Sequence, residues 1–184
     1  MRIISGSYRG KKIHEPKDVK TRPLKDLTKE SIFNIINHSN KFDIDLKNSK
    51  ILDLFSGVGS FGIECLSRGV KTVVFIESYS GVLPILKKNL INLNTVKNYE
   101  IIEKNIYDDK TFLSLKNKFD IIFLDPPYKN NIAESSILKL SKFGWIDENT
   151  LIILEKGKDE CFRSSFQLID RRIYGNTEIL FLKF

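Results

Sequence analysis

The sequence predicts an α/β fold, a mostly parallel seven-stranded sheet with helices on both faces and an antiparallel C-terminal hairpin at one edge. Three observations predict this fold. Short apolar runs alternate with helical stretches between residues 50 and 155, which is typical of parallel strands covered on both faces. The first run breaks into a glycine-rich loop that begins a helix. The last two runs flank Gly175-Asn176, a dipeptide typical of hairpin turns.

The N-terminal segment is expected to form a small β-hairpin and a helix ahead of the main sheet. Strand-like runs at 2–5 and 11–14 flank a turn, and a polar connection follows them. Asp26 can cap the helix, which we expect to end near His38. Its apolar side would consist of Leu27, Ile32, Phe33, Ile35 and Ile36.

The rest of the chain supplies the sheet and its covering helices. We expect residues 1–40 to be an extension and residues 41–184 to be the main domain. The expected strands are 50–54, 72–77, 99–103, 119–125, 150–155, 166–174 and 177–184. The expected helices are 60–67, 79–93, 110–116 and 132–142.

Length and composition limit the classes of protein to consider. A chain of 184 residues, 41% hydrophobic and 29% charged, can bury one full core but is short for two domains. No stretch approaches the roughly 20 apolar residues of a membrane span, and the start turns polar too soon for a signal peptide. We therefore expect a cytoplasmic protein without a membrane partner. Cys65 and Cys161, with only two histidines, support neither a disulfide nor a metal site, so we expect two buried free thiols.

Positive charge is concentrated at the N-terminus. Residues 1–30 hold nine basic and four acidic side chains, which is +5 of the net charge of +7. Such a surface attracts phosphate and nucleic acid, although a solvated terminal segment explains the charge as well. Arg2, Arg9 and Arg22 favour the first interpretation, since guanidinium groups match phosphate geometry.

The first apolar run leads into Gly57-Val58-Gly59-Ser60-Phe61-Gly62, which has the spacing G-x-G-x-x-G. Glycines let the backbone turn sharply and approach a ligand closely, and the N–H groups at the start of the next helix attract anions. Glu77 closes the next run twenty positions after Gly57, as in nucleoside-binding loops. A turn without a ligand is the alternative explanation.

The sequence Asp125-Pro126-Pro127-Tyr128 follows another buried run, at the sheet edge where open α/β sheets bind ligands. Two prolines make the loop stiff and leave mainly carbonyl acceptors. The Asp125 carboxylate and the Pro126 carbonyl could accept both N–H bonds of an exocyclic amine while Tyr128 stacks on its base. A plain β-turn is the alternative.

Together these motifs resemble a known family. Asp53-x-Phe55-x-Gly57-x-Gly59, then Glu77 and Asp125-Pro126-Pro127-Tyr128, are similar to the class I S-adenosylmethionine-dependent amino methyltransferases, which have a Rossmann-like fold. Within them the chain resembles the RsmD-type family, which methylates N2 of one guanine in bacterial 16S ribosomal RNA. The similarity extends over essentially the whole chain through Arg2-Ile3-Ile4-x-Gly6, Tyr8-Arg9-Gly10, Thr21-Arg22-Pro23, Glu30-x-x-Phe33-Asn34 and Leu66-Ser67-Arg68-Gly69.

The resemblance implies a role for each matching residue. S-adenosylmethionine would be bound by Asp53, Phe55, Ser56, Gly57, Gly59, Glu77, Asn105, Ile106 and Asp125, with Glu77 on the ribose and Asn105 near the adenine. Catalysis would use Asp125, Pro126 and Tyr128, and RNA would be held by Arg2, Arg9, Lys11, Arg22 and Pro23. The implied partner is ribosomal RNA, within a small ribosomal subunit or an assembly intermediate, and the implied state is a monomer. One departure is Leu24, where the family usually has Thr.

Three other functions fit parts of the pattern. A nicotinamide oxidoreductase shares the glycine loop, but the sequence offers no suitable second domain and no metal cluster for hydride transfer, and this reading leaves Asp125 unexplained. Methylation of adenine N6 or cytosine N4 in DNA, or of a protein glutamine, shares the Pro-Pro-aromatic turn but not the N-terminal segment. An RNA-binding assembly factor without catalysis would have no reason to retain Asp53, Glu77 and Asp125.

Overall fold

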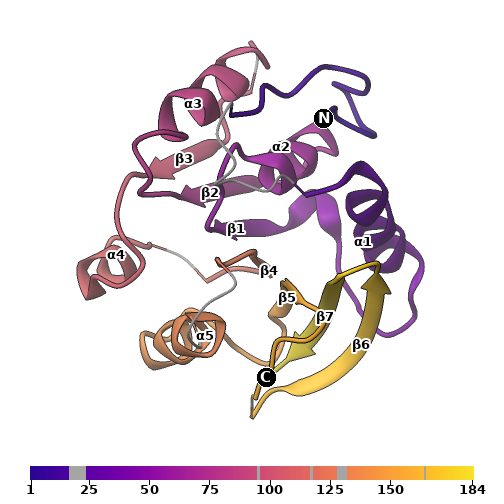
Figure 1. Ribbon diagram of the computed structural model, residues 1–184, viewed down its shortest axis with the longest axis vertical. Helices are drawn as coiled ribbons and strands as arrows, with labels where there is room; N and C mark the ends of the chain where they lie inside the picture. Colours follow the sequence, from indigo (N-terminus) through magenta and orange to yellow (C-terminus); the bar gives the residue numbers. More distant parts are fainter. Residues whose placement is uncertain (17–23, 95, 117, 128–131, 164) are drawn as a thin grey trace.

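The computed structural model describes the chain except residues 17–23, 95, 117, 128–131 and 164. It contains one seven-stranded sheet (Figure 1). From one edge to the other, the strands are β3 (Tyr99–Ile102), β2 (Thr72–Ile76), β1 (Lys50–Leu54), β4 (Ile121–Leu124), β5 (Leu151–Gly157), β7 (Thr177–Lys183) and β6 (Gln167–Tyr174). The first five are parallel, and β7 and β6 form an antiparallel hairpin next to β5. The predicted fold class is confirmed.

Helices cover both faces of the sheet (Figure 1). Apolar side chains of α1 (Asp26–His38), α2 (Ser60–Ser67) and α3 (Leu83–Ile91) pack with one set of strand residues, among them Phe75 and Phe123. Those of α4 (Asp109–Leu113) and α5 (Ile132–Lys142) pack with the alternate set, which includes Leu54 and Leu124. Successive strand residues point to opposite faces, so each buried strand serves both cores.

The element boundaries follow the sequence closely where the pattern is strong. The expected helices at 26–38, 60–67 and 132–142 and the strand at 50–54 match the observed bounds. The helix expected over 79–93 is shorter, because a turn at Tyr79 precedes Val82, the N-cap of α3. A 3-10 turn, Leu46–Asn48, lies in the linker before β1.

The N-terminal hairpin is looser than expected. In place of two strands there is one antiparallel bridge, Arg2 to Lys12, within residues 1–14, which we call the N-terminal arm. The arm also donates to α2, where the N–H groups of Ile4 and Ser5 bind the Glu64 carboxylate at 2.8 and 3.0 Å. These bonds replace the missing part of a strand ladder.

Three local expectations were wrong. Asp26 does not cap α1, because Lys25 is the N-cap and no side chain caps the helix. The Asp26 carboxylate lies 3.8 Å from the guanidinium of Arg2 and 3.8 Å from the amine of Lys29. Leu27 is 71% exposed, because the buried stripe of α1 follows Thr28, Lys29, Ile32, Phe33 and Ile36. Cys65 is buried but Cys161 is exposed, in the loop after β5.

Among the described residues, no helix combines the length and apolarity needed to cross a lipid bilayer.

Candidate active site

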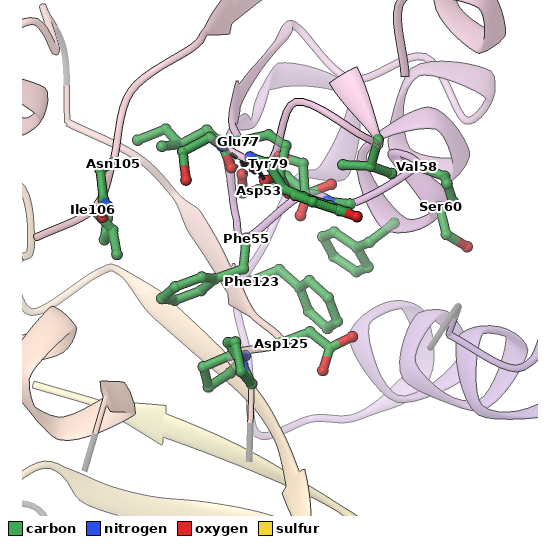
Figure 2. Close-up of a pocket in the computed structure, with 18 of the residues that line it drawn as sticks. Asp53, Phe55, Val58, Ser60, Glu77, Tyr79, Asn105, Ile106, Phe123 and Asp125 are labelled. Carbon is green, nitrogen blue, oxygen red and sulfur yellow. Dashed lines mark hydrogen bonds between the residues drawn. The ribbon is translucent and has the colours of Figure 1, made fainter. Parts of the chain in front are cut away.

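A cavity of about 600 Å³ lies at the carboxyl ends of the central strands, with its walls on the loops that follow them. Its volume is within the range of small-molecule sites in proteins. Figure 2 shows Phe55 in the middle of this region, with Glu77 on one side and Asp125 on the other. The cavity is lined by Leu24, Asp53, Phe55, Ser56, Gly57, Val58, Ser60, Phe61, Ile76, Glu77, Ser78, Tyr79, Val82, Lys104, Asn105, Ile106, Tyr107, Phe123, Asp125, Pro126 and Pro127.

The glycine loop turns by using left-handed backbone conformations. Gly57 and Gly59 have φ of 54° and 83°, and Phe55 has φ of 66°. A left-handed conformation costs a residue with a side chain about 1–2 kcal/mol, and such strain is concentrated at functional sites. This conformation of Phe55 had no signal in the sequence. It places a large aromatic ring on the cavity wall beside Ile106 and Phe123.

Asp53 supports the loop from below. Its Oδ2 atom accepts a 2.9 Å hydrogen bond from the N–H of Gly62 at the start of α2. A Cβ at Gly62 would lie 2.3 Å from the Phe75 ring and 2.9 Å from that carboxylate, which explains the third glycine of the motif. Burial, and to a smaller extent the charge of Glu77, raises the pKa of Asp53 to about 7.

Glu77 joins two loops through its carboxylate. One oxygen accepts the Gly57 N–H at 2.8 Å, and the other accepts the N–H groups of Ser78 and Tyr79 at 2.7 Å each. The acid twenty residues after the glycine loop is therefore a structural link between the loops after β1 and β2. Its contact with a ribose stays a prediction.

Asn105 and Ile106 form the wall after β3. The Asn105 side-chain oxygen accepts the Tyr107 N–H at 3.0 Å, and its backbone carbonyl accepts the Thr111 hydroxyl at 2.5 Å. Ile106 is 6% exposed and presents an apolar surface to the cavity. One lone pair of the Asn105 oxygen is used in this turn, so the side chain can offer a ligand its amide N–H groups and the second lone pair.

Asp125 follows β4 and lies at the cavity edge with Pro126. Within the described part of the chain its carboxylate accepts no hydrogen bond. Burial, then repulsion from Glu155 and Asp53, raises the pKa of Asp125 well above its ordinary value. The predicted catalytic Tyr128 lies outside the described residues.

Sequence reasoning missed Glu155, a buried acid on β5 beside Asp125. A signal was present, because the runs expected at 119–125 and 150–155 both end in a carboxylic acid and become neighbouring strands. It also missed the cavity residues Tyr79, Val82 and Tyr107, which no motif marked.

The predicted RNA-binding residues lie away from this cavity where the structure describes them. Arg2, Arg9 and Lys11 are exposed on the N-terminal arm, and none of them lines the cavity. The Lys11 amine donates to the carbonyl of Asn92 at 3.0 Å and lies over the Tyr8 ring. Arg22 and Pro23 fall outside the described residues, whereas the next residue, Leu24, is a buried part of the cavity wall.

Comparison with known proteins finds a matching family model, and similar proteins and solved structures whose names agree with one another. The family model described as "Conserved hypothetical protein 95" matches residues 1–183. The chain is 37% identical to the ribosomal RNA small subunit methyltransferase D of Haemophilus influenzae, over 87% of this chain and 80% of the relative. It is 32% identical to the protein of the same name from Escherichia coli K12, over 84% and 74%. Among solved structures, a putative methyltransferase from Escherichia coli has a TM-score of 0.80 at 28% identity, covering 100% of this chain and 97% of that one. A putative methylase from Haemophilus influenzae has a TM-score of 0.76 at 32% identity, covering 99% and 97%.

Proposed function

Because the chain belongs to the RsmD-type family of S-adenosylmethionine-dependent methyltransferases, we propose that it methylates the exocyclic N2 amine of a specific guanine in small-subunit (16S) ribosomal RNA. The chain is a methyltransferase, and its methyl donor is S-adenosylmethionine. The guanine, the N2 atom and the residue roles are the proposed part. The curated relatives support ribosomal RNA as the substrate by name.

The observation that carries the proposal is the Asp125 carboxylate, which lies at the edge of the cavity without a hydrogen bond from the described residues. Such a group can accept the N–H of an amine. The stiff loop after it holds the Pro126 carbonyl nearby as a second acceptor.

The residues of the cavity fit the methyl donor. When bound, the donor supplies a methyl group on a positively charged sulfur. Asp53, Glu77 and Asp125 bring carboxylates to this cavity, which complements the positive sulfur and amino group of the donor. The apolar surfaces of Phe55 and Ile106 suit a planar adenine, and the Asn105 amide lies beside them.

The chain's own residues would activate the acceptor. The lone pair of a guanine N2 amine is delocalised into the base, so the amine is a weak nucleophile. Acceptance of its two N–H bonds by Asp125 and the Pro126 carbonyl favours a pyramidal nitrogen whose lone pair points toward the methyl group. The carboxylate also stabilises the positive charge that develops on nitrogen, and correct alignment alone accelerates such a displacement greatly.

The same proposal covers location and partners. The N-terminal arm, with Arg22 and Pro23 after it, would hold the RNA, either in a small ribosomal subunit or in an assembly intermediate. The protein would act in the cytoplasm as a monomer. The target guanine would have to leave its stack to reach the cavity.

The experiment that tests this function is transfer of a radiolabelled methyl group to unmodified 16S ribosomal RNA and to small-subunit particles, followed by nucleoside analysis. N2-methylguanosine is expected. Label in N6-methyladenosine, or in ribosomal protein instead of RNA, would contradict the proposed acceptor.

Asp125→Ala should lower the rate of methyl transfer about 10²- to 10³-fold while leaving S-adenosylhomocysteine binding within a few fold of wild type. The reason is that the carboxylate acts on the amine, and the cofactor keeps the rest of its wall. Single-turnover transfer and calorimetric binding would measure the two effects. Asp159→Asn is the matched control, because Asp159 is exposed and does not line the cavity. If Asp125→Ala transferred methyl groups at the wild-type rate, Asp125 would have no role in catalysis.

A further inference from the structure

Two carboxylic acids meet where β4 ends beside β5. Leu124 pairs with Leu154 in the parallel register, and the next residues are Asp125 and Glu155. Asp53, Phe123 and Ile153 also align across neighbouring strands. Since side chains alternate along a strand, Asp125 and Glu155 face the same side of the sheet as those three residues.

If Glu155 had only a structural role, its burial would cost the folded protein free energy without a compensating bond. It is 7% exposed, and its Oε2 atom is buried without a hydrogen-bond partner in the described part of the chain. A buried polar atom without a partner costs free energy, and nearly all such atoms in folded proteins are paired. On β7, the residue opposite Glu155 is the apolar Ile179, which gives the carboxylate no compensation.

Among the residues that the structure describes, the charged groups that act on this pair are mostly negative. The negative charge of Asp53 on β1 raises the pKa of Asp125, and the negative charge of Glu77 raises the pKa of Asp53. The positive charge of Lys25, at the start of α1, lowers the pKa of Glu155. Burial raises the pKa of Glu155 to about 7, and burial with repulsion from Glu155 raises the pKa of Asp125. Two interacting acids titrate as a pair, so the pair can bind a proton near neutral pH.

We propose that Glu155 acts with Asp125 as one proton-accepting unit, in which Glu155 is a positioning residue that works through the Asp125 carboxylate. The inference rests on the proposed function, an amine acceptor at Asp125. As the amine nitrogen forms its bond to the methyl carbon, the carbon–sulfur bond breaks and its electron pair stays on sulfur. The nitrogen then carries a positive charge until one proton leaves it. Asp125 accepts that proton, Glu155 shares it, and solvent removes it after the product leaves.

The arrangement suits this task for a chemical reason. A proton acceptor works best when its pKa lies near the operating pH. A single exposed aspartate is a much weaker base, whereas a buried pair of carboxylates is raised toward neutrality. Burial of Asp125 already raises its basicity, and the charge of Glu155 raises it further.

The test is the pH dependence of methyl transfer by wild type and Glu155→Gln. The wild-type kcat/KM should fall as pH drops through the neutral range, because a protonated pair cannot accept. In Glu155→Gln the repulsion between the two carboxylates is gone, so the pKa of Asp125 falls. The acid limb of the pH profile, where kcat/KM falls with decreasing pH, should then move to lower pH by about one unit or more. The plateau rate should fall as well. Glu155→Asp keeps a carboxyl and should keep the limb near its wild-type position.

A second readout does not depend on activity. Infrared titration without substrate is done in Asp53→Asn, which lacks the other carboxyl with a pKa of about 7. It should show a carboxyl group that ionises near pH 7 and that is shifted when Glu155→Gln is added. Glu148→Gln, which removes the same charge from an exposed position, should change neither measurement.

Three outcomes are informative. A uniform loss of rate at every pH with an unmoved acid limb would mean a structural role only, and would overturn the proposal. If Glu155→Gln fails to fold, the infrared titration of Asp53→Asn decides, since the lack of any carboxyl that ionises between about pH 6 and 8 in that variant also overturns the proposal. If the wild-type product is not N2-methylguanosine, the proposed function fails, while the pH profile for the actual product still tests the pair.

Discussion

Asp53 holds the glycine loop and at the same time lines the cavity. Its carboxylate is 1% exposed and bonds to a backbone N–H, yet burial still raises its pKa to about 7. One hydrogen bond does not replace the lost hydration of a charged group. The folded protein therefore holds a proton on Asp53 under mildly acidic conditions.

This shift has a definite sign in the stability of the protein. A carboxyl whose pKa is raised from 3.8 to about 7 by folding stabilises the folded state fully below pH 3.8, and this contribution is lost as pH rises through about 7. Asp53→Asn keeps an oxygen for the Gly62 N–H but cannot ionise. Its free energy of unfolding relative to wild type should therefore increase between pH 4 and pH 8, by about 2–4 kcal/mol.

Urea unfolding at several pH values would measure this difference. Asp43→Asn, at an exposed position, should show a difference from wild type that stays nearly constant with pH. A constant difference for Asp53→Asn as well would show that Asp53 ionises normally in the folded protein.

At the scale of elements, the N-terminal arm is bound to α2 and α3. Glu64 of α2 is fully buried and accepts from the arm, while Lys29 and Arg68 provide its positive partners at 3.7 and 2.9 Å. Asn89 of α3 accepts from the His14 N–H and donates to the carbonyls of His14 and Val58. The arm, α3 and the glycine loop are therefore linked through one amide side chain.

Close contact between the arm and α2 depends on Gly6. A Cβ at Gly6 would lie 1.9 Å from the carbonyl oxygen of Ser67, and that oxygen also accepts the Ser7 N–H at 2.8 Å. Gly10 has a similar φ, 85° against 82°, but a Cβ there would meet nothing within 4 Å. Both glycines thus have a left-handed backbone conformation, but only Gly6 lies where an added Cβ would collide with another part of the chain.

Gly6→Ala should therefore destabilise the protein by about 1–3 kcal/mol more than Gly10→Ala. Chemical denaturation would give both values, and amide exchange would show whether Ile4 and Ser5 lose protection. Equal destabilisation by the two substitutions would mean that the arm does not dock closely on α2.

At the scale of the whole molecule, the arm separates its apolar and basic residues. Ile3 and Ile13 are buried in the core shared with α1 and α2, whereas Arg2, Arg9, Lys11 and Lys12 are exposed. Docking of the arm therefore leaves much of the basic charge of the N-terminal segment on the surface. This distribution supports the proposed contact with RNA phosphates.

If the arm binds phosphates, Arg9→Ala should weaken RNA binding and reduce the slope of log K against log salt by about 0.7–0.9 for each lost contact. Arg22→Ala should do the same. Lys142→Ala is the matched control, because Lys142 is exposed at the end of α5, on the other face of the sheet. An unchanged salt slope in Arg9→Ala and Arg22→Ala would exclude the arm from the RNA site.

The fold could be predicted from the sequence in nearly all its elements, since each depends on a local pattern. Apolar runs of strand length, helical periodicity over 26–38 and 132–142, and the Gly175-Asn176 turn are properties of neighbouring residues. The errors arose where distant groups compete for the same atoms. The arm has one bridge instead of two strands because Glu64, some sixty residues away, binds its N–H groups.

The sequence alone determined the α/β class, the glycine loop, the Asp125-Pro126-Pro127-Tyr128 motif and the family, because each is encoded in the order and spacing of nearby residues. Only the tertiary structure decided which side chains meet. Strand order and register place Glu155 beside Asp125 across thirty positions of sequence, and loop packing commits Glu77 to three backbone N–H groups. Burial, which sets the protonation of Asp53, Asp125 and Glu155, is likewise a property of the folded chain, because it depends on what surrounds a group in space.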